Sequence, residues 1–112
     1  MEIKNFKIKT EYYFEAFQNK NLEWLNQLYS KNIILIDWEN NVIGRDNVIK
    51  INQSLFKEDF KLEVLDIIQS NNQTINTIFI EIPKHNIAIE VIDILTFNYK
   101  TFEIEKIRAY KG

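Results

Sequence analysis

The chain has 112 residues, a length at which one domain is expected, and its hydrophobic content of 46% is enough to form a buried core. Its formal net charge of -2 gives no electrostatic reason to expect nucleic acid or an anionic membrane surface as a partner. It contains no cysteine, which excludes disulfides, thiolate nucleophiles and cysteine metal sites, and which is consistent with a cytoplasmic location.

The sequence has no repeat, linker or Pro/Gly-rich segment that would divide it into separate domains. Residues 1–5 lack the long apolar stretch of a signal peptide, and no apolar run is long enough to cross a membrane. The single proline is Pro83, and the two glycines are Gly44 and Gly112. We therefore expect one domain over residues 1–112. Helical patterns come first and strand patterns follow, an order that favours an α+β fold.

Three helices are predicted in the first half. The first runs from about Asn5 to about Asn19, with apolar and aromatic residues near one stripe. Asn21 is a plausible N-cap for the second helix, whose apolar residues are Leu22, Leu25, Leu28 and Tyr29. Gly44 breaks the chain before the third helix, in which Asp46 is a possible cap and the buried stripe is Val48, Ile51, Leu55 and Phe56.

The strands are predicted mainly in the second half. A short strand covers 33–38, and a turn follows at 39–41. Three longer strands cover roughly 60–69, 74–82 and 87–99, and a last strand covers 101–110. The apolar phase of the last strand slips between Ile104 and Ile107, which predicts a bulge or a strong twist.

Residues 83–86 are typical of a hairpin loop between two of these strands. With Lys84-His85 at its centre, Asn76 pairs with Asp93 on a face that is otherwise aliphatic, where Ile78 pairs with Val91. Cross-strand partners lie close enough for the Asn76 amide to hydrogen-bond the Asp93 carboxyl group.

Asp93 is the most informative residue, because its neighbours on that strand face are Ile87, Ile89, Val91, Leu95 and Phe97. A carboxylate in such surroundings must find donors or take up a proton. A core carboxylate satisfied by Asn76 or by the backbone is the simple structural alternative. A carboxyl group that is kept neutral is a candidate catalytic group.

Asp37 and Tyr13 complete a possible acid/base set with Asp93. Asp37 ends an apolar strand beside a polar turn, so it could reach a cavity while remaining partly solvated. One carboxylate can remove a proton next to a carbonyl group, while a tyrosine and a neutral carboxylic acid donate to the enolate oxygen. Packing of Tyr13 in an aromatic stripe, and a turn role for Asp37, remain open alternatives.

These segments resemble the ketosteroid isomerase and SnoaL-like branch of the nuclear transport factor 2-like superfamily. The resemblance covers nearly the whole chain. It rests on the stretch from Tyr13 through Asp37, on Gly44 before the third helix, and on the segments 92–98 and 102–110. It implies a curved, mostly antiparallel sheet that forms a cone around three helices, with an apolar pocket open at one end.

The resemblance also implies roles for residues. It places the family's tyrosine donor on Tyr13, its general base on Asp37 and its protonated aspartic acid on Asp93. The opposed pKa values of two such carboxyl groups are the known arrangement in ketosteroid isomerase. We expect a small apolar ligand that contains a carbonyl group to bind against Phe17, Ile51, Leu55, Asn76, Ile78 and Phe97.

Other chemistries are disfavoured by the residues present. No His/Asp/Glu cluster has metal-ligand spacing, so neither a metal nor another cofactor is expected. His85, the only histidine, lies in the predicted hairpin loop. The epoxide-hydrolase members of the superfamily use an Asp-Arg-Asp arrangement, and neither Arg45 nor Arg108 lies beside Asp93 on its strand.

Two further functions remain open. The chain could be a binding module that holds an apolar ligand in the cone without turnover. It could also be an interaction protein, because the outer face of the predicted hairpin carries Ile75, Phe79, Ile92 and Ile94 beside Glu81 and Glu90. A face so apolar predicts a homodimer formed through the outer side of the sheet.

Overall fold

The computed structural model describes residues 5–112. Residues 1–4 lie outside the described part, so most of the segment considered for a signal peptide and the first residues of the expected domain are not covered. The elements in chain order are α1 (Phe6–Gln18), α2 (Leu22–Leu28), β1 (Tyr29–Ile36), β2 (Asn41–Ile43), α3 (Arg45–Leu55), β3 (Lys61–Ser70), β4 (Gln73–Ile82), the single-turn 3₁₀ helix η1 (Pro83–His85), β5 (Ile87–Phe97) and β6 (Ile104–Lys111).

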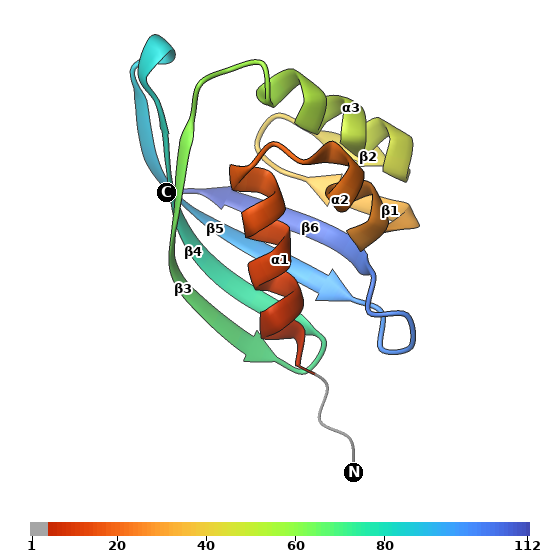
Figure 1. Cartoon of the computed structure of the whole chain (residues 1–112). Coiled ribbons are helices and arrows are strands. Elements are labelled where there is room, and N and C mark those ends of the chain that lie inside the picture. Colours follow the sequence, from red (N-terminus) through yellow and green to blue (C-terminus); the bar gives the residue numbers. More distant parts are fainter. Residues whose placement is uncertain (1–4) are drawn as a thin grey trace.

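The helices lie on the inner side of a curved, unclosed sheet (Figure 1). The strand order is β2-β1-β6-β5-β4-β3. Strands β1 and β6 are parallel, and every other neighbouring pair is antiparallel. This is the predicted α+β cone. None of the helices in residues 5–112 is long and apolar enough to cross a membrane.

Asparagine caps start the first two helices. Oδ1 of Asn5 accepts a hydrogen bond from the Ile8 amide at 3.3 Å, and Oδ1 of Asn21 accepts from the Trp24 amide at 3.0 Å. The third helix starts differently. Its N-cap is Gly44 with φ of 104°, and Asp46 lies in the first turn, so the prediction of Asp46 as a cap was wrong. A residue with a Cβ would be strained at such a φ, which explains the glycine.

The region from Tyr29 to β2 departs from the prediction. Tyr29 is the first residue of β1 rather than the end of a helix, and it has extended backbone angles (φ -83°, ψ 138°). Its ring is fully buried. Strand β2 was not predicted, because it is only three residues long and follows a polar turn. It pairs with the end of β1, where Ile36 lies opposite Asn41.

The β4–β5 hairpin has the predicted register. Ile82 lies opposite Ile87, and Asn76 lies opposite Asp93. The irregularity predicted in the last strand is also present. Thr96 pairs with Lys106 and Phe97 pairs with Ile104, so Glu105 is the extra residue of a bulge.

One end of the cone is closed by aromatic packing. The Phe6 ring at the start of α1 stacks on Phe97 with centroids 4.9 Å apart, and Phe102 packs against it at 5.5 Å. A second aromatic cluster lies where α1 ends, with Phe17 edge-on to Phe56 at 5.0 Å. Aromatic side chains therefore fill the space between the helices and the sheet at the Phe6 end, and any cavity must lie away from that end.

Candidate active site

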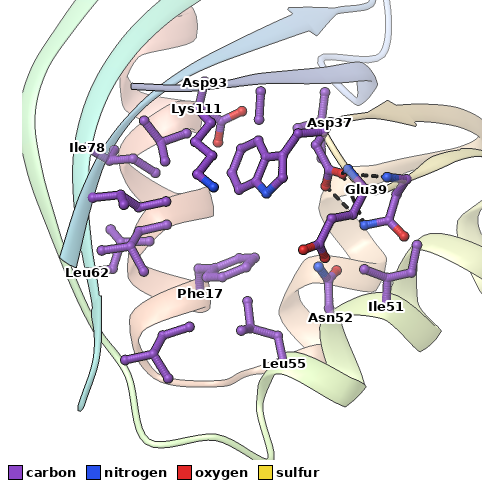
Figure 2. A pocket seen from close by; sticks show the side chains of 18 of the residues that line it. Phe17, Asp37, Glu39, Ile51, Asn52, Leu55, Leu62, Ile78, Asp93 and Lys111 are labelled. Atoms are coloured by element: carbon purple, nitrogen blue, oxygen red, sulfur yellow. Dashed lines mark hydrogen bonds between the residues drawn. The ribbon is translucent and has the colours of Figure 1, made fainter. Parts of the chain in front are cut away.

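A cavity of about 790 Å³ lies between the helices and the inner face of the sheet. This volume is in the range of small-molecule sites. Helices α1 and α3 supply one wall, strands β4, β5 and β6 supply the other, and the end of β1 lies between them (Figure 2). The lining is mainly apolar, with Phe14, Phe17, Leu35, Val48, Ile51, Leu55, Leu62, Ile78, Ile80, Val91, Ile107 and Ala109 among its residues.

The mouth of the cavity is marked by lining residues that are exposed to solvent. These are Trp38, Glu39, Ser54, Asn86, Ile87, Ala88 and Lys111. Strand alternation places Ile107, Ala109 and Lys111 on one side of β6, so the lysine continues the inner wall towards the mouth. Figure 2 shows the Lys111 side chain directed into the cavity.

Asp93 points into the cavity from the middle of β5. It lies between Asn76 on β4 and Ala109 on β6, and it is 6% exposed. Its Oδ1 is buried without a hydrogen-bond partner in residues 5–112. Burial, and then the negative charge of Asp37, raise the pKa of Asp93 to about 7. The group is thus poised between its neutral and charged forms near neutral pH.

Asp37 follows directly after β1 and is half-buried in the cavity wall. Its Oδ1 accepts hydrogen bonds from the amides of Glu39 at 2.8 Å and Asn40 at 2.6 Å. The Asn40 side-chain amide donates to both carboxylate oxygens, at 3.1 and 3.2 Å. These donors satisfy the charged form and fix the carboxylate in a tight turn.

Tyr13 reaches the cavity wall from α1, and the centroid of its ring lies 6.3 Å from that of the Tyr29 ring. The Tyr29 hydroxyl donates to Oδ1 of Asn52 at 2.7 Å. Burial, above all, raises the pKa of both tyrosines, so both hydroxyl groups stay protonated.

Asn76 does not bond the Asp93 carboxyl group, in contrast to the expectation. Its Nδ2 donates to the main-chain oxygen of Asp93 at 2.9 Å and to the main chain and hydroxyl of Thr74 at 3.3 and 3.1 Å. The backbone and Thr74 supply nearer acceptors, and Thr74 is itself bonded to Thr10 at 2.7 Å. The Asp93 carboxyl group therefore receives no hydrogen bond from the side-chain amide of Asn76, the residue opposite it.

The predicted ligand residues divide into two groups. Phe17, Ile51, Leu55 and Ile78 line the cavity, as do Tyr13, Asp37 and Asp93. Asn76 and Phe97 do not line it, and both are fully buried in the packed end of the cone.

Sequence reasoning missed Asn52, Ala109 and Lys111 as lining residues of the cavity, and it missed Tyr29 as the partner of Asn52. Asn52 carried a signal, because it lies four residues after Val48 on the buried stripe of α3. A polar residue on such a stripe needs a partner, which is the Tyr29 hydroxyl.

No arginine or histidine of residues 5–112 lines the cavity. Arg45 and Arg108 are absent from its lining, and Arg108 packs over the Tyr110 ring instead. His85 lies at the hairpin tip, where Nε2 is 3.2 Å from a Glu58 carboxylate oxygen. Within residues 5–112, no three His, Cys, Asp or Glu side chains are grouped so that they could hold a metal ion.

No protein-family model and no curated protein matches the chain. Solved structures do match. An NTF2-like protein of unknown function from Cytophaga hutchinsonii has a TM-score of 0.83 and 13% identity, covering 100% of this chain and 95% of that one. A candidate ketosteroid isomerase from Kribbella flavida has a TM-score of 0.85 and 11% identity, covering 96% and 77%. A candidate SnoaL-like polyketide cyclase from Shewanella denitrificans has a TM-score of 0.81 and 15% identity, covering 96% and 90%.

These identities show a shared fold and not a shared activity. The similar structures are of the NTF2-like, ketosteroid-isomerase-like and SnoaL-like kinds, the branch that the sequence resembles. The chain therefore has the nuclear transport factor 2-like fold.

Proposed function

We propose that the protein is a small enzyme that moves a proton next to the carbonyl group of a small apolar ligand. The observation that carries the proposal is the Asp93 carboxyl group, which is buried in the wall of an apolar cavity without a partner on Oδ1. A neutral carboxylic acid in such a place can donate a hydrogen bond to an oxygen atom of a ligand.

Asp37 is the proposed base. Its carboxylate would take a proton from the carbon next to the carbonyl group. The electron pair of that C–H bond would form the C=C bond of an enolate, and the π electron pair of the carbonyl group would move onto its oxygen. Asp93 and Tyr13 would donate hydrogen bonds to this oxygen. In a ligand with a further C=C bond conjugated with the enolate, return of the proton from Asp37 to the far carbon of that C=C bond would complete an isomerisation.

The surroundings of the two carboxyl groups support this division of roles. Four hydrogen-bond contacts from the 39–40 turn hold the Asp37 carboxyl group in place at the cavity wall. Burial and the Asp37 charge favour the neutral form of Asp93 by raising its pKa to about 7. One group is thus suited to accept a proton and the other to donate a hydrogen bond.

The proposal can be tested without knowing the substrate. Exchange of the hydrogens next to the carbonyl group of cyclohexanone and acetophenone would be followed by NMR in D₂O. We expect the protein to accelerate exchange and Asp37→Asn to remove the acceleration. Asp93→Leu should slow exchange on the order of a hundredfold. Exchange at the uncatalysed rate with every ketone tested would contradict an enzymatic role.

A binding module without turnover is the second candidate. It is favoured by one observation, namely that Oδ1 of Asp37 already accepts hydrogen bonds from the amides of Glu39 and Asn40. This function predicts that phenols bind in the cavity while no ketone exchanges its hydrogens. Titration of the wild type and of Asp93→Leu with 4-ethylphenol separates the two functions when it is combined with the exchange experiment.

A homodimer through the outer sheet face is the proposed assembly. The face opposite the helices carries Ile68, Ile75, Phe79, Ile92, Ile94 and Tyr110, of which Ile68 and Tyr110 are exposed. Sedimentation equilibrium of the wild type and of Ile92→Lys tests this assembly. A wild type that is monomeric at all concentrations would contradict it.

A further inference from the structure

The charged groups of the cavity wall are unevenly distributed between its depth and its mouth. In residues 5–112, Lys111 is the one cationic side chain that lines the cavity, and three carboxyl groups line it as well, those of Asp37, Glu39 and Asp93. Asp93 is buried, whereas Lys111 is exposed at the mouth. A ligand in the cavity therefore meets a positive charge only where the cavity opens to water.

The backbone of β6 holds Lys111 at this place. Lys111 lies opposite Val91 on β5, and the amide of the next residue, Gly112, donates to the main-chain oxygen of Glu90 at 2.8 Å. Strand alternation then puts the lysine on the inner side of the sheet, together with Ala109. Figure 2 shows its side chain directed into the cavity. The ammonium group is thus presented to the ligand by a strand that is paired to its end.

The Lys111 ammonium group has no partner. In residues 5–112 it makes no hydrogen bond, no ion pair and no contact with an aromatic ring face. Its three donors are therefore available to an acceptor that enters the mouth. The simple alternative is a lysine whose apolar stem covers the edge of the cavity while its charge remains in water. That alternative predicts no preference for a charged ligand.

We propose that Lys111 binds a carboxylate group of the ligand, and that the ligand is an apolar keto acid. Its carboxylate lies at the mouth and its carbonyl oxygen lies at Asp93. The proposal rests on the function proposed above for the carbonyl group, and it adds the chemical class of the ligand. One cation among three carboxyl groups matches a single negative charge better than a phosphate group, which carries nearly two.

The register of the sheet sets the orientation and the size of this ligand. Asp93 lies opposite Ala109, and Lys111 follows two residues later on β6, which is about 7 Å along the strand. A body of roughly the length of a benzene ring therefore separates the two oxygen-bearing ends of the ligand. The opposite orientation would bury the ligand carboxylate in an apolar wall without a cation, which is costly.

The test compares 4-ethylphenylacetate with 4-ethylphenylacetamide, two probes of nearly the same shape that differ in charge. Neither contains a ketone, so their binding does not require proton transfer. The measured quantity is the Kd of the amide divided by the Kd of the carboxylate, from NMR titration at pH 6. We expect the wild type to prefer the carboxylate about fivefold, the effect of one partly solvated ion pair. Lys111→Met should abolish or reverse this preference, and Lys111→Arg should keep it.

Lys106→Met is the matched control. Lys106 lies on the same strand, its replacement changes the net charge equally, and it does not line the cavity. This variant should keep the wild-type preference within about twofold, because a charge outside the cavity is screened by solvent and salt. The ratio of two dissociation constants also cancels any effect of a substitution on folding or on the shape of the cavity.

A second measurement locates the carbonyl group. Hydrogen exchange of 4-acetylphenylacetate should be faster than that of 4-acetylphenylacetamide at limiting ligand concentration, and Lys111→Met should remove the difference. Equal exchange rates for the two ketones in the wild type would contradict a keto acid that is held by Lys111 with its carbonyl oxygen at Asp93.

The remaining outcomes separate this inference from the function on which it rests. A wild type that binds the amide as tightly as the carboxylate, or that binds neither, would overturn the inference. An equal loss of preference in Lys106→Met and Lys111→Met would also overturn it, because the effect would then belong to net charge. A preference that depends on Lys111, with every ketone exchanging at the uncatalysed rate, would leave a carboxylate site in a protein without the proposed activity. Catalysed exchange of acetophenone without any preference for the carboxylate probe would keep the activity and eliminate the acid.

Discussion

Asp37 and Asp93 face the same cavity from strands that are not neighbours. Asp37 follows β1 and Asp93 lies within β5, with β6 between those two strands. The charge of Asp37 nevertheless contributes to the raised pKa of Asp93, after burial as the larger cause. The curvature of the sheet thus lets the charge of one carboxyl group act on another that is far away in the sequence.

The raised pKa of Asp93 predicts that stability falls as pH rises. The ordinary pKa of 3.8 is raised to about 7, so between these values the native state keeps a proton that the unfolded state has lost. Stability therefore decreases through this window, by on the order of 4 kcal/mol, and changes little above about pH 7.

Asp93→Asn removes this titration. Compared with the wild type, the variant should be more stable at pH 8 and nearly equal to it at pH 4, as measured by urea unfolding. Asp66→Asn, which changes an exposed carboxylate on β3, is the control and should show no such difference between the two pH values. Equal stability of Asp93→Asn and wild type at pH 8 would mean that ionisation of Asp93 in the folded protein costs little free energy.

The same titration predicts an alkaline limit for activity. Loss of the Asp93 proton removes a donor and adds a charge near the enolate oxygen, so the rate of ketone hydrogen exchange should fall as pH rises above about 7. Asp93→Asn keeps a donor that does not titrate. The exchange rate of this variant should be lower than that of the wild type, but it should not fall as pH rises above about 7. A fall at the same pH in both proteins would assign the titration to another group.

Asp37 combines a structural role with the proposed chemical one, and two substitutions separate them. Asp37→Asn keeps an oxygen that can accept from the Glu39 and Asn40 amides, whereas Asp37→Ala leaves both amides without it. We expect both variants to lose exchange activity, and only Asp37→Ala to lose stability, by about 1 kcal/mol. Full activity in Asp37→Asn would eliminate Asp37 as the base.

Asp37→Asn also reports on the coupling of the two carboxyl groups. Because the Asp37 charge raises the pKa of Asp93, its removal should lower that pKa. The ¹³C chemical shift of the Asp93 carboxyl carbon, followed by NMR against pH, measures this change. An unchanged titration would show that burial alone sets the protonation of Asp93.

Much of the fold was predictable from local patterns. The stripe spacing of the helices and the period-two pattern of the strands predicted an α+β fold, whereas the cone was implied by the resemblance to the superfamily. The loop length predicted the register that places Asn76 opposite Asp93. Tyr29 was misplaced because an apolar residue after a helix pattern fits either a helix or a strand. In the strand it makes tertiary contacts that the local pattern does not contain, among them the pairing with Ile104 and the hydrogen bond to Asn52.

The site was less predictable, because side-chain partners depend on distances that the sequence does not contain. The inward phase of Asp93 followed from strand alternation, but the choice of the Asn76 amide between a carboxyl group and two backbone oxygens did not. Phe97 shares the inner face with Asp93 and still lies outside the cavity. It is nearer the closed end of the cone, where the Phe6 ring covers it.

Ala109 offers a test of the cavity that leaves every proposed polar group in place. It lies opposite Asp93 on β6 and lines the cavity, so its small side chain leaves room beside the carboxyl group. Ala109→Phe should fill this room and weaken 4-ethylphenol binding on the order of tenfold or more, while Ala109→Ser should bind nearly as well as the wild type. Binding that survives Ala109→Phe would place the ligand elsewhere than beside Asp93, and neither the proton-transfer function nor the donor role of Tyr13 would then have a ligand within reach.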